Sequence, residues 1–174
     1  IGRDPKAKIF NKIKYIFSDP KSALSMFKQR FSNKNDLSSI NDKIREVFGF
    51  CPDIQFIEHH RAHLASAFFS SPFEESTIVS IDGSGDFSTI MIAVGNGNKI
   101  RVIESQDFPV SLGIFYSAFT QFLGFPYYGD EYKVMGLSPY GKPTFLNELR
   151  KIIWTEKKEI LKWDNDFFDL NNGA

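Results

Sequence analysis

All three histidines of the chain lie in the pentapeptide HHRAH at residues 59–63. If this segment is helical, His59 and His63 are one turn apart, and their side chains stack about 6 Å apart on one face. Two imidazoles placed in this way can share one metal ion, as they do in zinc-protease helices. The same pattern is also compatible with histidines that cap or pack the start of a helix without a metal.

His60 points about 100° away from the other two histidines on such a helix, so we expect a different role for it. We consider it a candidate general base. Zinc proteases carry a catalytic glutamate directly after the first histidine, and a histidine in that place excludes their chemistry. Two histidines also leave a metal short of ligands. We therefore expect a third ligand from outside this chain.

A second candidate segment, Asp82-Gly83-Ser84-Gly85-Asp86, follows a strand-like run at residues 77–81. Glycines in a hairpin turn let backbone N–H groups point at an anion, and small side chains allow a phosphate to approach. Asp82, at the end of a buried strand, can hold a metal or a metal-bound water. We expect the turn to bind a cofactor through Gly83, Ser84, Gly85 and Asp86. An ordinary Asp-Gly hairpin turn is the alternative.

The third candidate segment, residues 129–141, reads GDEYKVMGLSPYG. Asp130 and Glu131 suit the first turn of a helix, where carboxylates interact favourably with the helix dipole. Lys133, one turn further, can reach a phosphate or a carbonyl oxygen. We therefore consider Lys133 a catalytic candidate and Glu131 a cofactor-binding candidate, and a short acidic-capped helix before a Pro/Gly loop remains the alternative.

The elements that must position these residues follow from periodicity and turn signals. The pattern predicts a short strand at 54–58, a helix at 59–70, an antiparallel meander of three strands between 77 and 104, and a helix at 111–123 that ends at Gly124. The last helix should turn Leu112, Phe115, Phe119 and Phe122 inward. Strands followed by helices, without an internal repeat, indicate an α+β fold or half of a larger α/β unit.

The residues before Cys51 have a different character. We expect helices over Ile9–Phe17, over a segment with Leu24, Phe27 and Phe31, and from a cap at Asp36 or Ser38 to Gly49. Residues 1–34 contain nine Lys and Arg but only two acids. Such a stretch can bind nucleic acid or an anionic membrane, but a solvated basic face is the simpler interpretation, so no nucleic acid is expected. We divide the chain into a basic helical insertion or subdomain at 1–50 and a second domain at 51–174.

Composition limits the class of protein. The single cysteine, Cys51, cannot form an internal disulfide, which favours a reducing, cytoplasmic compartment. No apolar run reaches the ~18 residues that a membrane span requires. Because the chain starts at Ile1 without a methionine and stops abruptly, we expect a piece truncated at both ends.

Four segments, taken in order, resemble one family: residues 58–69 (EHHRAHLASAFF), 82–85 (DGSG), 108–113 (FPVSLG) and 131–141 (EYKVMGLSPYG). Together they resemble the amino-terminal part of the nodulation-protein U/cephamycin O-carbamoyltransferases, over roughly residues 52–172. The resemblance implies part of an actin/hexokinase-like (ASKHA, RNase H-like) domain with an antiparallel meander and flanking helices, related to the universal tRNA threonylcarbamoyl transferase.

The resemblance also implies a chemistry. In that family a YrdC-like domain of the same full-length chain makes carbamoyl adenylate from carbamoyl phosphate and ATP. The ASKHA-like domain then passes the carbamoyl group to a hydroxyl of a small-molecule or glycan acceptor, with a divalent metal, Fe²⁺, held by a His-x-x-x-His pair. Here that pair is His59 and His63, the Asp82 turn lies by the adenylate phosphate or the carbamoyl group, and Lys133 lies near the nucleotide.

The YrdC-like domain and a later metal-binding aspartate are expected outside this chain, so the chain alone should be inactive. Two other functions remain open. A sugar-kinase-like ATPase would share the fold and the glycine turn, but it has no use for the histidine pair. A non-catalytic interaction module would bind through the basic helices, with a steep dependence on salt.

Overall fold

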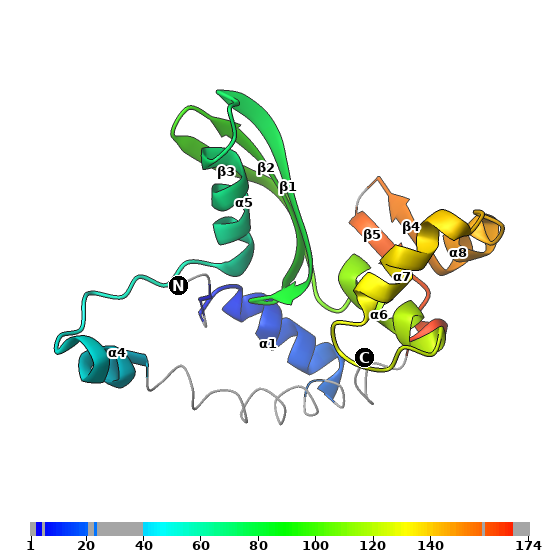
Figure 1. Ribbon diagram of the computed structural model, residues 1–174, viewed down its shortest axis with the longest axis horizontal. Coiled ribbons are helices and arrows are strands. Elements are labelled where there is room, and N and C mark those ends of the chain that lie inside the picture. The colour runs from blue at the N-terminus through cyan, green and yellow to red at the C-terminus, as the bar shows by residue number, and fades with distance from the viewer. Residues whose placement is uncertain (1–2, 5, 21–22, 24–39, 158, 169–174) are drawn as a thin grey trace. The chain divides into compact units, whose positions relative to one another are not determined.

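The computed structural model describes residues 3–4, 6–20, 23, 40–157 and 159–168. The chain forms two compact units, one made of residue 1 with residues 8–56 and the other of residues 2–7 with residues 57–174. Each unit is described by itself (Figure 1). Within the described part of the chain, none of the helices combines the length and apolar character needed to cross a bilayer.

The first unit contains helices α1 (Ile9–Ser18) and α4 (Ile40–Phe48). Helix α1 ends at Asp19, next to Pro20, as the sequence predicts. Helix α4 ends before Gly49, whose positive φ of 74° is a backbone conformation that glycine adopts without strain. These two predicted helices are confirmed. The helix predicted around Leu24, Phe27 and Phe31, and the caps predicted at Asp36 and Ser38, lie outside the described residues.

The second unit is built on a three-stranded antiparallel sheet of β1 (Glu75–Gly85), β2 (Ser88–Asn96) and β3 (Lys99–Asp107), in the order β1-β2-β3. This is the predicted meander. The prediction of a strand at 54–58 is wrong, because residues 51–58 form neither strand nor helix. A strand needs a neighbour to pair with, and the described strands pair only as β1-β2-β3 and β4-β5.

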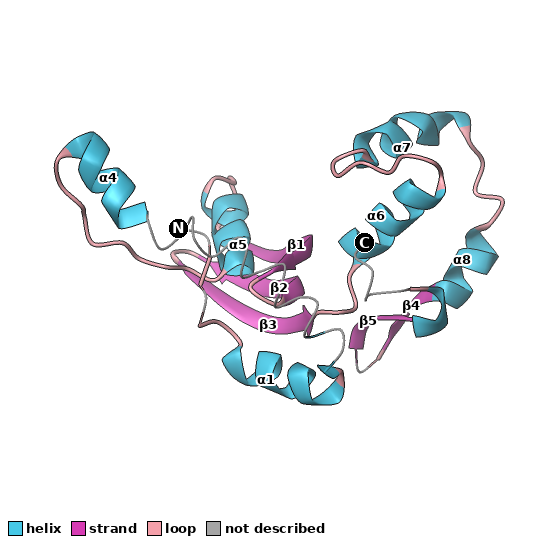
Figure 2. Cartoon of the chain, turned by 90° about the horizontal axis from the view of Figure 1, so that it is seen from below, coloured by secondary structure: helices cyan, strands magenta, loops and turns pink. Residues whose placement is uncertain are grey.

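Helix α5 (His59–Phe69) packs on one face of the sheet (Figure 2). The core consists of Leu64 and Phe68 from the helix with Ile78, Met91 and Ala93 from the strands. Strand β1 alternates, so Ile78 and Ser80 are buried whereas their neighbours in sequence are exposed. This alternation turns the same side of β1, and therefore residue 82 further along, toward α5.

The chain reverses direction between β1 and β2 at Asp86 and Phe87, and not at the glycines. Both turn residues have positive φ, 51° and 85°, as in a type I′ hairpin turn. Strand β1 continues to Gly85, with an irregular register against β2 between Ile81 and Gly85. The prediction of a turn at residues 82–86 is therefore corrected, since Asp82, Gly83 and Ser84 form a bulged end of a strand.

A third group of elements follows the sheet: α6 (Leu112–Phe122), α7 (Glu131–Leu137), η1 (Ser138–Tyr140), α8 (Leu146–Ile152), the hairpin β4 (Ile153–Glu156) and β5 (Glu159–Trp163), and η2 (Asn165–Phe167). Helix α6 ends at Gly124, as predicted, where φ is 92°. Phe115 and Phe119 are half-buried, with ring centroids 4.7 Å apart, but Phe122 is 83% exposed. The prediction that Phe122 points inward is wrong.

The mixture of helices with an antiparallel sheet confirms the α+β class. The sheet, α5 and the start of α6 are the elements that carry the candidate site.

Candidate metal centre

Two carboxylates fix the start of α5. The Glu58 side chain caps the helix by accepting a hydrogen bond from the backbone N–H of Arg61 at 3.0 Å. The Asp86 carboxylate accepts one from the N–H of His59 at 2.9 Å. The first amides of a helix have no partner within the helix, so these bonds set where α5 begins. The bond to Asp86 also ties that helix end to the β1–β2 turn.

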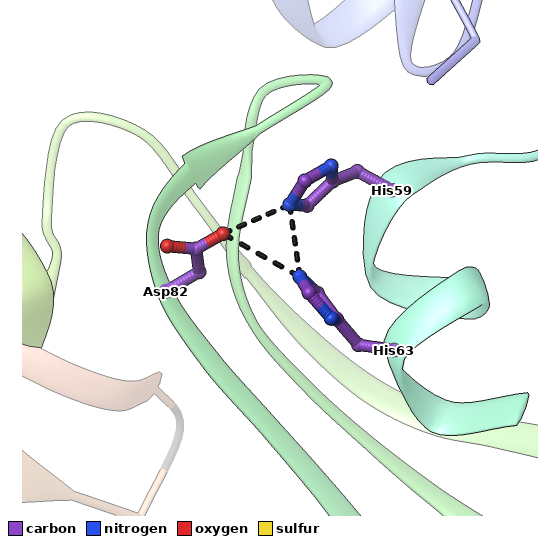
Figure 3. Close-up of side chains that lie close together, drawn as sticks. All are labelled: His59, His63 and Asp82. Atoms are coloured by element: carbon purple, nitrogen blue, oxygen red, sulfur yellow. Dashed lines mark hydrogen bonds and ion pairs between the residues drawn. The ribbon is translucent and has the colours of Figure 1, made fainter. Parts of the chain in front are cut away.

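His59 and His63 of α5 converge with Asp82 of β1 (Figure 3). The Nε2 atom of His59 lies 2.9 Å from Asp82 Oδ2 and 2.9 Å from His63 Nε2, and His63 Nε2 lies 3.7 Å from the same carboxylate oxygen. A tetrahedral metal with ordinary bond lengths holds two ligating nitrogens about 3.3 Å apart. Small side-chain rotations would therefore fit these three atoms around one ion.

The Asp82 carboxylate is oriented by its own strand. Its Oδ1 atom accepts a hydrogen bond from the N–H of Gly83 at 2.6 Å, which leaves Oδ2 to face the histidines. Partial burial acts to raise the pKa of Asp82, but the Gly83 N–H and His59 outweigh it, and the pKa lies below its ordinary value. The carboxylate is thus ionised at neutral pH, as a metal ligand must be.

Asp82 changes the ligand set expected from the sequence. The sequence indicates that Asp82 can hold a metal, but the third ligand beside the two histidines was expected from outside this chain. The structure places the Asp82 carboxylate itself against both histidines. The side chain of His63 is 51% exposed and that of Asp82 is 40% exposed, so the group is open to solvent on one side. Two imidazoles and a carboxylate suit zinc or iron(II), and such a set leaves coordination positions for a substrate.

His60 is fully buried between α5 and the sheet. Its Nδ1 atom lies 2.8 Å from the Ser80 hydroxyl and its Nε2 atom 3.1 Å from the carbonyl oxygen of Ser88. Burial lowers the pKa of His60, so the ring is neutral, with Nε2 donating to Ser88 and Nδ1 accepting from Ser80. Neither nitrogen is left to take a proton from a substrate. This placement does not support the general base that we expected.

We expect His60→Ala to lower the free energy of unfolding by about 3 kcal/mol, because it opens a cavity and removes the hydrogen bonds of His60 to the Ser80 hydroxyl and the Ser88 carbonyl. His63→Ala, the same change on the exposed face of the same helix, should cost less than about 0.5 kcal/mol in the metal-free protein. Urea denaturation of both variants measures the difference. Equal losses would contradict the structural role of His60.

Lys133 and Glu131 of α7 each contact a side chain outside that helix. The Lys133 ammonium lies 2.7 Å from a carboxylate oxygen of Asp130, whose side chain is only 9% exposed. This contact lowers the pKa of Asp130 and raises that of Lys133. The Glu131 carboxylate accepts a hydrogen bond from Ser117 and so joins α7 to α6. The catalytic role expected for Lys133 near a nucleotide, and the cofactor-binding role expected for Glu131, stay predictions.

The remaining predicted residues lie at the end of β1. Ser84 is exposed, whereas Gly85 is buried against the ring of His59. One carboxylate oxygen of Asp86 accepts hydrogen bonds from two backbone N–H groups, those of Asp4 and His59. Asp86 therefore supports the start of α5. The phosphate-binding role predicted for Gly83, Ser84, Gly85 and Asp86 stays a prediction.

Sequence reasoning missed the residues that support Asp82 from the other side. Ser111 and Gly113, at the start of α6, contact the backbone of residues 82 and 83. A serine before a helix indicates a cap, but nothing in the sequence indicates which segment that cap touches.

The chain matches the family described as the carbamoyltransferase N-terminus over residues 8–172, a range that includes α1 and α4. It is 46% identical over 96 residues to an uncharacterized protein of Synechocystis sp., sll1178, covering 55% of this chain and 16% of that protein. It is also 46% identical over 90 residues to nodulation protein NolNO of Sinorhizobium fredii (52% of this chain and 13% of that protein). With nodulation protein NolO of Bradyrhizobium diazoefficiens it shares 46% identity over 93 residues (53% and 17%).

The matched part of the chain thus spans only 13–17% of the length of these curated relatives. The family match covers nearly all of the chain, and it includes every residue of the histidine–aspartate group. The chain belongs to the carbamoyltransferase N-terminus family, whose amino-terminal domain has an actin/hexokinase-like (ASKHA) fold.

Proposed function

We propose that the protein takes part in transfer of a carbamoyl group from carbamoyl adenylate to a hydroxyl of a small-molecule or glycan acceptor. We further propose that His59, His63 and Asp82 hold a divalent metal ion, iron(II), that assists the transfer. The observation that carries this proposal is the convergence of three ligand atoms within 4.8 Å of one another in a chain of a carbamoyltransferase family. Two relatives are named nodulation proteins, which is compatible with a glycan acceptor.

In this reaction the acceptor oxygen forms a bond to the carbamoyl carbon, and the bond from that carbon to the adenylate phosphate breaks. AMP leaves, and the hydroxyl proton is released to water. His59, His63 and Asp82 would hold the metal ion, which would supply Lewis acidity toward the carbamoyl carbonyl group. No covalent intermediate with the protein is needed, because the adenylate is already an activated donor.

The chain's own residues would hold and orient the reacting groups. His59 and His63 present their Nε2 atoms from one face of α5, and Asp82 presents one oxygen from the opposite side. Beside them lies an open hollow of about 410 Å³, lined in part by His63, Ser66 and Asp82. A hollow of this size can admit a sugar or a similar acceptor next to the ligands.

The test is a transfer assay under anaerobic conditions. The protein is given iron(II), ATP, carbamoyl phosphate and a separately supplied YrdC-type domain that forms carbamoyl adenylate, with monosaccharides, oligosaccharides and polyols as acceptors. Mass spectrometry detects the carbamoylated acceptor, and chromatography detects AMP. We expect Asp82→Asn to lower the rate at least tenfold, about 1.4 kcal/mol in the barrier. Asp42→Asn, on the exposed surface of α4, should keep the rate.

A rate that survives both chelation of the metal and Asp82→Asn would contradict the metal-assisted mechanism. Formation of ADP with a phosphorylated acceptor, in place of AMP with a carbamoylated one, would instead identify a sugar-kinase-like ATPase.

A further inference from the structure

Ser111, which precedes α6, is fully buried and bonded on two sides. Its Oγ atom accepts a hydrogen bond from the N–H of Ile114 at 3.1 Å and so caps α6. The same hydroxyl lies 2.7 Å from the carbonyl oxygen of Gly83 and 3.0 Å from that of Asp82. A hydroxyl has one proton to donate, so the two carbonyls share it. One oxygen atom thus joins the first turn of α6 to the bulged end of β1.

Gly113 brings the same two elements into direct backbone contact. A Cβ atom at this position would lie 2.6 Å from the backbone nitrogen of Gly83, 2.7 Å from its Cα atom and 2.8 Å from the carbonyl carbon of Asp82. All three are main-chain atoms, which cannot rotate away as the end of a side chain can. Only glycine at position 113 allows α6 to approach the Asp82–Gly83 peptide this closely.

That peptide determines where the Asp82 carboxylate points. The N–H of Gly83 holds Oδ1, and the other oxygen therefore faces His59 and His63. The sheet cannot fix this peptide by itself, because the register of β1 against β2 is irregular between Ile81 and Gly85. The contact with α6 holds the Asp82–Gly83 peptide in place where the β1–β2 ladder is irregular.

We propose that Ser111 and Gly113 are positioning residues that aim Asp82 at the histidine pair through the Asp82–Gly83 peptide. The inference rests on the proposed function only in taking His59, His63 and Asp82 as metal ligands. Groups that orient a metal ligand without touching the metal commonly change metal affinity by 10- to 100-fold. We expect losses of that size here.

The experiment combines two measurements on Ser111→Ala and Gly113→Ala. The first is the affinity for cobalt(II), a spectroscopic substitute for iron(II), measured by absorption titration; we expect it to fall at least tenfold. The second is amide hydrogen exchange in the metal-free protein, where the N–H of Gly83 should exchange at least tenfold faster, while amides of the β2–β3 ladder keep their rates. The control is Gly136→Ala in α7, where an added Cβ meets no atom within 4 Å.

Ser111→Thr keeps the hydroxyl and should restore most of the cobalt(II) affinity lost in Ser111→Ala. It also keeps the test valid if Gly113→Ala does not fold. Unchanged affinity and unchanged exchange at Gly83 in Ser111→Ala would overturn the inference. If the unsubstituted protein binds no cobalt(II) but the exchange at Gly83 still accelerates in Ser111→Ala, the proposed metal function fails and the positioning of Asp82 stands.

Discussion

Alanine at His59, His63 or Asp82 should lower the affinity for iron(II), or for cobalt(II) in its place, by at least about 100-fold. A structural zinc site with four ligands gains about 10–16 kcal/mol on binding, which is about 3 kcal/mol for each ligand. A loss of that size corresponds to a factor of about 100 in the dissociation constant. Calorimetric or absorption titration of each variant at pH 7 measures the dissociation constant of the metal.

The matched control for these variants is His60→Ala. His60 is buried and bonded to Ser80 and Ser88, so its loss should weaken the fold and spare the metal ligands. Metal affinity in His60→Ala, measured at a temperature where the variant is still folded, should stay within about threefold of the original. Equal loss of metal in all four variants would refute the assignment of His59, His63 and Asp82 as the ligands.

Gly85→Ala should lower metal affinity at least tenfold. A Cβ at position 85 would lie 2.0 Å from Cδ2, 2.3 Å from Cγ and 2.7 Å from Cβ of His59. The contact reaches the base of the side chain, so ring rotation alone cannot relieve it, and α5 or β1 must move. Overpacking of this kind costs about 1–3 kcal/mol of stability, and it displaces a proposed ligand from Asp82.

Gly83→Ala is a close control, two residues away on the same bulged strand. A Cβ at Gly83 meets no atom within 4 Å, and neither glycine has a positive φ. The two variants therefore differ mainly in contact with His59. We expect Gly83→Ala to keep both its melting temperature and its metal affinity. If Gly85→Ala also binds metal as tightly as the original protein, the end of β1 does not constrain His59.

The predictable parts of the fold and site are those set by local spacing. The i, i+4 relation of His59 and His63 needs only a helix, and Glu58 provides the cap that starts it. The meander follows from strand-like runs, with a glycine turn at Gly97 between β2 and β3, and Gly124 marks the end of α6. In each case the deciding interactions lie within a few residues of one another.

The parts that were missed depend on contacts between distant segments. Asp82 lies against the two histidines only because the alternation of β1 turns it toward α5. The hydrogen-bond partners of His60 are Ser80 and Ser88, which lie in the strands, and the helical pattern around residue 60 cannot identify them. The reversal at Asp86 and Phe87 has no glycine to mark it, and Asp86 is held there by the amides of distant residues.

The three proposed ligand side chains come from a short stretch of chain, residues 59–82, which includes only α5, the turn that follows it and most of β1. Closing so short a loop has a low entropic cost and brings the ligands together early in folding. An ion bound there would also cross-link the helix to the strand and slow the local opening of that pair. Chelation should therefore raise proteolysis first at the connection between α5 and β1, before the rest of the sheet opens.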